Sequence, residues 1–374
     1  MLTTKNSMSN SIDTFFDVSS YFPIATVTVG TIGNLLAFLI IISNKELRIL
    51  STMVYLAFLC IINTLSLIHW NLDFHFLVIN YKITMVDSNM IVCKLLTFIQ
   101  YTSFQIIGIL NCLICIDFYY VLNLRYNPFR IGRLNKCFAS RKSAVIWSLS
   151  VILFMSLINI HFIAFNGYWV PEKELKTSYK VVDTNGTIIN ELIEIKKEQQ
   201  SFQCYKYPLN YGILLTIWDH VINAFYNYIP IMLIILFDLI IIVKLIKSSR
   251  SNKFIVTNHL NLNMDEDDDA VIMKLDYRQI KRLGISVLIW SILFLLMTAP
   301  TQIMFTFWFH LDKSKTTKLI SIIMDTILYI QHGSIFYLFF ITNNLFRKNA
   351  IKFFKKICCC CCCSSNGKQI QEKF

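Results

Sequence analysis

The stretch "CLICIDFYYVLNLRY" (residues 112–126) ends a long apolar segment with a single acid. The segment from Leu95 to Ile116 carries no charge, and Asp117 follows it directly. About 20 apolar residues form a helix long enough to cross the roughly 30 Å hydrocarbon core of a membrane. The stretch therefore predicts a membrane-spanning helix whose apolar part ends at the carboxylate of Asp117. It raises the question of which group pairs with that carboxylate.

Similar runs recur along the chain, which has 374 residues, 55% of them hydrophobic. Because a bilayer offers no water to unpaired backbone groups, runs of this kind must be helical. A buried helix of a soluble protein would explain any single run, but not seven of them. The predicted fold class is an all-α membrane protein, a seven-transmembrane helix bundle with a C-terminal amphipathic membrane-surface helix. The other six runs are Tyr21–Ser43, Ile49–Asn71, Ser143–Pro171, Val221–Phe237, Leu283–Leu311 and Leu319–Leu345.

The basic residues predict the orientation, because cytoplasmic connections carry an excess of Lys and Arg. With the amino terminus outside, the inner side receives Lys45, Arg48, the groups 125–142 and 244–282, and the C-terminal tail. The formal net charge of +12 then faces anionic lipid, so it does not indicate nucleic-acid binding. The polar first residues lack the apolar core of a cleaved signal peptide. We expect a multi-pass protein of the plasma membrane with an extracellular segment 1–20, a transmembrane domain 21–345 and a cytoplasmic helix and tail 346–374.

Two groups of cysteines carry predictions. Cys93 and Cys204 are the cysteines on the predicted outer side, an oxidising compartment, so we expect a disulfide between them. Six more follow a segment with one apolar and one basic face, which is typical of a helix lying on the membrane. Acylation would strengthen that anchor; an idle tail and metal binding are the alternatives, although a bare run lacks zinc-site spacing. These six are Cys358, Cys359, Cys360, Cys361, Cys362 and Cys363.

Two polar connections are long. The outer one, residues 172–211, contains the sequon Asn185-Gly186-Thr187 on the lumenal side, so Asn185 is a predicted glycosylation site. The inner one, residues 246–281, contains the acidic run Asp265–Asp269 and is expected to be a solvated linker. No internal repeat of the transporter kind is evident.

Short motifs occur in a fixed order along the predicted helices. They are Gly33-Asn34, "STMVYLAFLCIINTL" (residues 51–65), Asp117 with Tyr119, Trp147, Pro230, Phe294 with Pro300, and Phe346-Arg347. In this order, and in the spacing from Cys93 to Phe118, the chain resembles the rhodopsin-like G-protein-coupled receptors over nearly its whole length, most of all invertebrate peptide receptors. The resemblance implies that an extracellular ligand signals through the chain to heterotrimeric G proteins.

Several switch positions depart from the family pattern. Phe118 stands where the family has an arginine, and Asn63 stands at the sodium-site aspartate. Such replacements change the free-energy difference between the inactive and active conformations. The result could be constitutive activity, altered coupling or no signalling. For Asp117, the alternative is a carboxylate that only reaches toward the membrane interface. The predicted switch residues are Asn63, Asp117, Phe118, Tyr119, Asp238, Phe294, Thr298, Pro300 and Phe339.

A ligand site is expected in the outer half of the bundle, where ionisable groups are costly in lipid and usually face a cavity. The acids Asp73, Asp219 and Asp325 favour a cationic ligand such as a peptide bearing Arg or Lys. Solvation at the interface, or pairing with loop lysines, is the alternative for these acids. Gln100 replaces the aspartate of amine receptors, which argues against an amine. The candidate ligand-binding residues are Asp73, Gln100, Asp219, His220, Thr301, Gln302, Phe305 and Asp325.

Three function hypotheses follow. The first is a G-protein-coupled receptor, and the second is a receptor-fold binder or chemosensory variant that does not couple normally. The third is a channel or transporter, which would need polar residues along several helices. No nucleophile–base set or metal-ligand spacing occurs, so we expect neither an enzyme nor a cofactor or metal. The expected partners are an extracellular ligand, a heterotrimeric G protein and membrane lipid, and no nucleic acid.

Overall fold

A computed structural model describes most of the predicted helical runs. The described residues are 21–79, 89–126, 138–170, 174–182, 188–197, 201–204, 217, 221, 224–250, 277–307 and 315–363. The side chains of some of them, such as those of 69–79, are not described.

Each of the seven predicted runs contains a helix in its described part. Six helices are long and apolar enough to cross a membrane, and a bent pair could form one more span. This is consistent with a multi-pass membrane protein. The helices are α2 (Tyr21–Ser43), α3 (Lys45–Arg48), α4 (Ser51–Ile79), α5 (Met90–Tyr126), α7 (Arg141–Ile158), α8 (Ile160–Phe165), the π-turn η3 (Ala224–Tyr228), α10 (Ile229–Arg250), α12 (Tyr277–Phe307), α13 (Lys315–Gly333), α14 (Ile335–Thr342) and α15 (Asn344–Cys363).

The outward faces of these helices are apolar. In α7, for example, Ile146 and Leu153 are each 63% exposed, and neighbouring large apolar side chains are exposed as well. Soluble monomers rarely expose continuous apolar surface of this kind. The surface chemistry therefore agrees with lipid contact.

The bent pair is α13 and α14, which meet at Ser334 at an angle of 57°. The sequence predicted a single span here, interrupted only by the charge of Asp325. The bend follows Gly333, and Gly30 of α2 lies against it so closely that a Cβ on Gly333 would be 2.7 Å from the Gly30 Cα. Two glycines let these two backbones touch, and glycine also weakens a helix interior.

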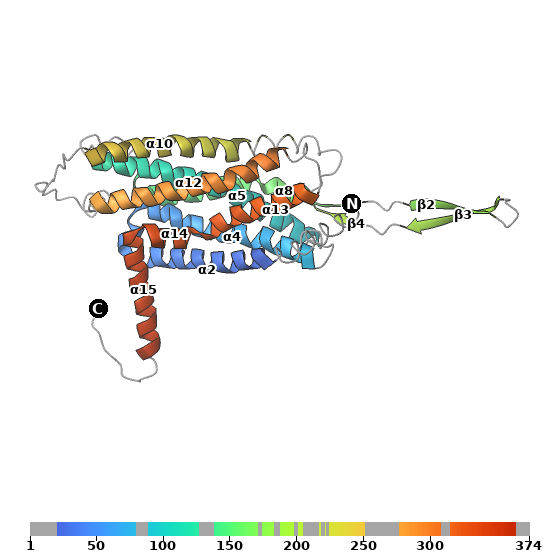
Figure 1. The fold of residues 1–374 in the computed structure, drawn as a ribbon, viewed down its shortest axis with the longest axis horizontal. Coiled ribbons are helices and arrows are strands. Elements are labelled where there is room, and N and C mark those ends of the chain that lie inside the picture. The colour runs from blue at the N-terminus through green and yellow to red at the C-terminus, as the bar shows by residue number, and fades with distance from the viewer. Residues whose placement is uncertain are drawn as a thin grey trace, which may run out of the picture.

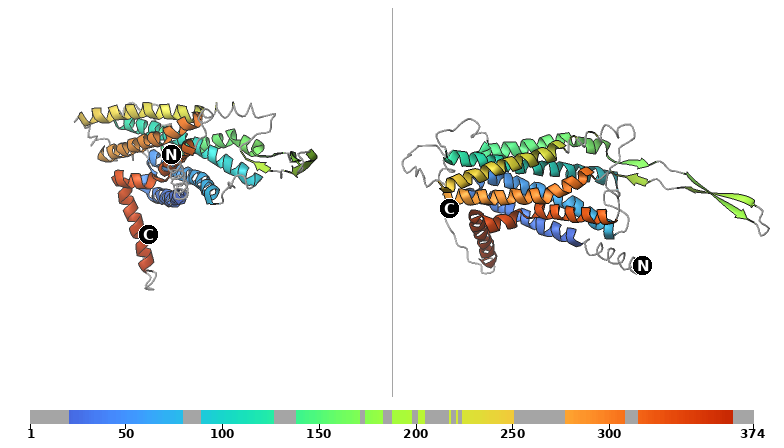
Figure 2. Two further views of the ribbon diagram at one scale, coloured as in Figure 1. Left: turned by 45° about the vertical axis from the view of Figure 1, so that its right-hand side comes forward. Right: turned by 45° about the horizontal axis from the view of Figure 1, so that its top comes forward.

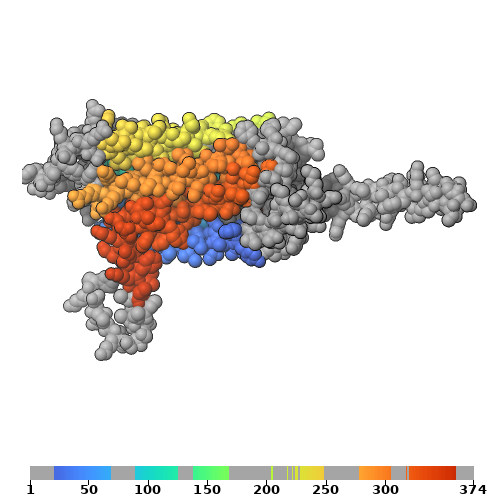
Figure 3. Space-filling view, in the orientation of Figure 1, coloured from blue at the N-terminus to red at the C-terminus, as the bar shows by residue number. Residues whose placement is uncertain are grey.

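The long helices run alongside one another, and two features mark the opposite ends of the bundle (Figures 1 and 2). At one end α15 leaves across the direction of the other helices. At the other end the hairpin of β2 (Glu174–Val182) and β3 (Ile188–Lys197) projects, close to where α2 begins. We call these the α15 end and the hairpin end. On the face shown in Figure 3, α10, α12, α13 and α2 lie side by side in that order.

Two small antiparallel sheets lie in the outer connection between the helices, where the sequence predicted no strands. They are β1 (Tyr168–Val170) with β4 (Ser201–Gln203), and β2 (Glu174–Val182) with β3 (Ile188–Lys197). The long hairpin places Glu174 opposite Lys197 and Lys180 opposite Glu191. The charge-rich outer connection thus contains regular structure.

The predicted disulfide is present and joins the start of α5 to the end of β4. Cys93 and Cys204 are bonded, with their Cα atoms 5.8 Å apart. Beside the bond, the Asn166 Nδ2 donates to the Thr97 Oγ1 at 3.0 Å. The sheet-bearing connection is therefore fastened to the hairpin end of the bundle.

Candidate functional site

The partner of Asp117 is a pair of hydroxyl groups. Asp117 is fully buried in α5, and Ser51 and Thr52, the first residues of α4, donate to its Oδ2 atom at 2.9 and 2.6 Å. Hydroxyl donors offset part of the cost of burying a carboxylate. The alternative interpretation, a carboxylate reaching toward the membrane interface, is contradicted by this burial.

Phe118, next to Asp117, packs into a notch in α12. Its ring is fully buried, and a Cβ added to Gly284 would lie 2.6 Å from the Cε1 and Cζ atoms of Phe118. The Leu245 side chain of α10 lies beside the same point, 3.5 Å from that Cβ position. Only a residue without a side chain leaves room for the ring. The contact between α5 and α12 at the arginine position of the resembling family is thus steric and apolar.

Two buried hydrogen bonds join α12 to its neighbours on the hairpin side of this notch. The Trp290 Nε1 donates to the Asn111 Oδ1 of α5 at 2.6 Å, and the Ser291 Oγ donates to the Asp238 Oδ2 of α10 at 2.6 Å. Asp238 is 5% exposed. We call the six residues of these three contacts the α12 clasp: Asn111, Phe118, Asp238, Gly284, Trp290 and Ser291.

Four of these six residues were not predicted from the sequence. Asn111, Trp290 and Ser291 were passed over because single polar residues in apolar runs have many ordinary roles. Gly284 was passed over because one glycine in a helix gives no spacing pattern. The available signal was a polar side chain in each of three runs at similar distances from the predicted cytoplasmic end.

Tyr119 joins α5 to α10 nearer the α15 end. The Lys244 Nζ lies 3.9 Å from the centroid of the Tyr119 ring and also donates to the Asn123 Oδ1. The ring meets Phe237 edge-on, with centroids 5.6 Å apart. A cation over an aromatic face is attracted by the ring quadrupole. These contacts hold the end of α10 against α5.

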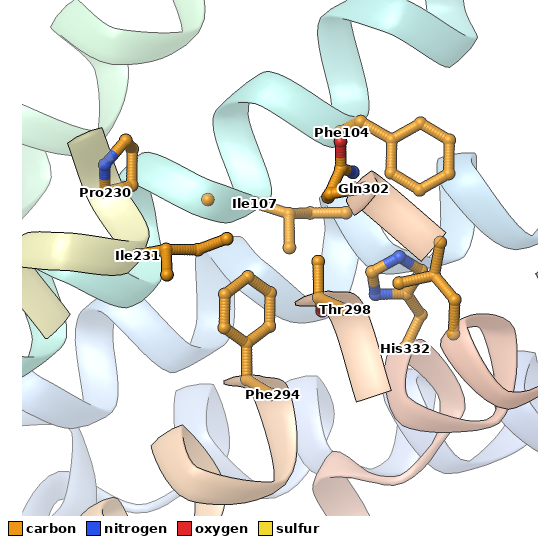
Figure 4. Close-up of a pocket in the computed structure, with 10 residues that line it drawn as sticks. Phe104, Ile107, Pro230, Ile231, Phe294, Thr298, Gln302 and His332 are labelled. Carbon is orange, nitrogen blue, oxygen red and sulfur yellow. The ribbon is translucent and has the colours of Figure 1, made fainter. Parts of the chain in front are cut away.

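A small cavity lies between α5, α10, α12 and α13 (Figure 4). Its wall is mostly apolar. The cavity brings together two predicted switch residues, Phe294 and Thr298, and one predicted ligand residue, Gln302. In Figure 4, Ile231 and Pro230 of α10 lie across from His332 of α13. The remaining wall is formed by Phe104, Ile107, Gly108 and Leu328.

Among the described side chains, those of Asp325, Thr301 and Gln100 do not line this cavity. Asp325 is buried in α13, and the Thr301 Oγ1 donates to the Met324 backbone oxygen at 3.2 Å, which ties α12 to α13. Gln100 is half-buried in α5. Asp73 and Phe305 lie in helices, but their own side chains are not described. Asp219 and His220 lie outside the described residues. The acidic ligand pocket therefore stays a prediction.

Buried polar groups without partners occur near the middle of the bundle. Asn63, where the resembling family has an aspartate, is fully buried, and neither of its side-chain polar atoms has a partner among the described residues. The same holds for Gln331 and for the His332 ring nitrogens. His332 packs against Phe104, with ring centroids 5.5 Å apart. Since buried polar groups are normally hydrogen-bonded, ordered water is expected here.

The remaining predicted residues have the following places. Pro300 lies inside α12, and Phe339 of α14 is buried against Phe346 of α15, with ring centroids 6.2 Å apart. Cys358 is exposed on α15, while Cys359–Cys363 lie in that helix without described side chains. Asn185 lies outside the described residues. Within the described part of the chain, no three His, Cys, Asp or Glu side chains are grouped to hold a metal ion.

No protein-family model matches the chain, and no curated protein is similar to it at a significant level.

Proposed function

We propose that this chain is a seven-helix receptor of the plasma membrane that transmits the binding of an extracellular ligand to heterotrimeric G proteins. In this proposal the hairpin end is extracellular and the α15 end is cytoplasmic. Acidic residues at the hairpin half of the bundle, Asp325 among them, would favour a cationic peptide as the ligand. The motif order along the chain and the disulfide at the start of α5 support the assignment.

The α12 clasp is the observation that carries the proposal. Signalling across a bundle requires an element with two discrete arrangements whose balance a ligand can shift. The α15-end half of α12 is fastened to α5 and α10 by the Phe118 ring in the Gly284 notch and by two buried hydrogen bonds. Releasing these contacts would free α12 to move as a unit, a known form of switching.

The strength of the clasp suits such a switch. A buried hydrogen bond contributes about 1 kcal/mol net, and removing a buried Phe side chain typically costs about 3–5 kcal/mol. A ligand can shift a two-state equilibrium only by its difference in affinity for the two states, and about 5.5 kcal/mol reverses a ratio of 1:99. The clasp contacts are of this order, so ligand binding could open them.

Basal and peptide-stimulated G-protein activation in cells would test the proposal. The wild type would be compared with Phe118→Arg, which restores the arginine of the resembling family, and with Phe118→Leu as a control that stays apolar. We expect Phe118→Arg to change basal activation more than Phe118→Leu at equal surface expression. If no form activates any G protein across a broad panel of cationic peptides, the signalling proposal fails.

A second candidate is a receptor-fold binder that does not couple to G proteins. The buried, apolar Phe118 favours it, because this side chain lacks the charge with which the family arginine contacts a G protein. Saturable peptide binding without activation of any G protein would support the binder. A channel or transporter would instead produce solute flux in reconstituted vesicles.

A further inference from the structure

A polar cleft lies at the α15 end, between the start of α12 and the junction of α14 with α15. Its empty volume is about 600 Å³. The wall on the α12 side consists of Arg278, Gln279 and Arg282, and the opposite wall consists of Asn343, Asn344, Leu345 and Lys348. The cleft is separate from the mid-bundle cavity and from the α12 clasp.

The cleft is lined by positive charge. Arg278, Arg282 and Lys348 are all exposed, and among the described residues that line the cleft none is an acid. Like charges gathered on two elements repel one another unless an anion lies between them. A guanidinium presents a planar fork of donors that matches the oxygens of a phosphate. The wall is thus suited to an anion that carries several oxygens.

Asn343 adds a buried donor to this wall. Its side chain is 2% exposed, and its Oδ1 accepts a hydrogen bond of 3.0 Å from the Phe346 backbone nitrogen, which caps the start of α15. This bond fixes the orientation of the side-chain amide, so the Oδ1 and Nδ2 atoms cannot exchange positions by a flip of the amide group. The Nδ2 has no acceptor among the described residues. An anion in the cleft would supply one, at a helix start that favours negative charge.

We infer that this cleft binds the phosphoryl group of an anionic phospholipid from the adjacent membrane leaflet. A phosphate monoester on the headgroup, as in phosphatidylinositol bisphosphate, carries nearly two negative charges at neutral pH, so it matches this basic wall better than a single carboxylate or a singly charged phosphodiester would. The lipid source follows from α15, which exposes Ile351 and Ile357 together with Lys352, Lys355 and Lys356 just beyond the cleft. Such a helix lies on an anionic membrane surface and holds the cleft at headgroup level. The inference rests on the proposed membrane arrangement and not on G-protein coupling.

Binding of fluorescent short-chain phosphatidylinositol bisphosphate to the purified full chain would test this inference. The cleft variant would be Arg282→Gln with Lys348→Gln. The matched control would be Lys352→Gln with Lys355→Gln, which removes the same charge from α15 outside the cleft. All four side chains are exposed, so neither variant should disturb packing. We expect the cleft variant to lose about tenfold or more in affinity and the control to lose much less, because charged hydrogen bonds are strong.

A soluble competitor separates the possible sources of the phosphoryl group. Phosphatidylcholine should not bind, and inositol trisphosphate should compete more weakly than the lipid if the membrane supplies the ligand. Equal losses in both variants, or no binding by the wild type, would overturn the inference. Binding of the soluble phosphate as tightly as the lipid would overturn the lipid assignment. Since no G protein is present in the assay, these outcomes are independent of the signalling proposal.

Discussion

At the scale of single residues, Asp117 is stabilised by hydroxyl groups of another helix. We predict that Thr52→Val, which keeps the shape but removes the donor of the 2.6 Å bond, will destabilise the protein by about 1–3 kcal/mol. Thermal unfolding in detergent would measure the loss. Thr64→Val is a matched control, because Thr64 in the same helix donates only to the backbone of its own helix. Equal effects of the two substitutions would contradict the role given to Thr52.

The fit of Phe118 against Gly284 leads to a second prediction. Gly284→Ala should destabilise the protein by about 1–3 kcal/mol, because the new methyl group would lie 2.6 Å from the ring. Phe118→Leu should relieve part of this cost, since the shorter side chain leaves room for the methyl group. The double variant would then be more stable than the sum of the two single effects predicts.

The measurement is a double-mutant cycle of thermal stability with the two single variants and the double variant. Strict additivity would show that the ring and the glycine do not share the space that the structure gives them. Basal signalling of the same variants would separately report on the proposed switch.

Residue-scale contacts were only partly predictable. The sequence drew attention to Asp117 because one acid after a long apolar run is costly in lipid. Its partners could not be found in the same way, since Ser51 and Thr52 are distant in sequence and hydroxyl groups leave no charge pattern. The glycine notch was equally hidden, because shape complementarity depends on how α5 and α12 cross.

At the scale of helices and strands, α2 and α13 meet through their backbones. A Cβ on Gly333 would lie 2.7 Å from the Gly30 Cα, and backbone atoms cannot move aside as side chains can. We predict that Gly333→Ala will abolish most of the folded protein, measured as the monodisperse peak in fluorescence-detected size exclusion. Gly33→Ala is the graded comparison, because its nearest obstacle is the Tyr337 ring, at 2.9 Å. A peak of wild-type height for Gly333→Ala would contradict the close approach of the two helices.

The elements themselves followed from hydrophobic periodicity and length with two exceptions. Every predicted run contains helix, because long charge-free segments leave few other stable structures in lipid. The bend at Ser334 was missed since tertiary contact at Gly333, rather than local sequence, decides it. The β2–β3 hairpin was not predicted, because its strands carry mixed charges and lack a strict alternation of apolar and polar residues.

At the scale of the whole molecule, the two ends of the bundle differ in chemistry. The hairpin end carries the disulfide, whereas the α15 end carries the basic cleft and the lysines of α15. Disulfides persist in oxidising compartments, and basic residues collect on the cytoplasmic side of membranes. The disulfide favours an extracellular hairpin end and the basic residues favour a cytoplasmic α15 end. The two rules therefore agree, although they rest on different residues.

This agreement yields a prediction about topology. The sequon at Asn185 lies between Val182 and Ile188, the last paired residues of the projecting hairpin, so it should be glycosylated if that end is extracellular. Treatment with a glycosidase should then increase the gel mobility of the wild type, but not that of Asn185→Gln or Thr187→Ala. Asn190→Gln, a nearby substitution outside the sequon, should leave the shift intact. An epitope at the carboxyl terminus should be labelled only after the cells are permeabilised, because α15 lies at the opposite end from the hairpin (Figure 1). Labelling of that epitope on intact cells would place the α15 end outside the cell, and this would contradict the proposed orientation.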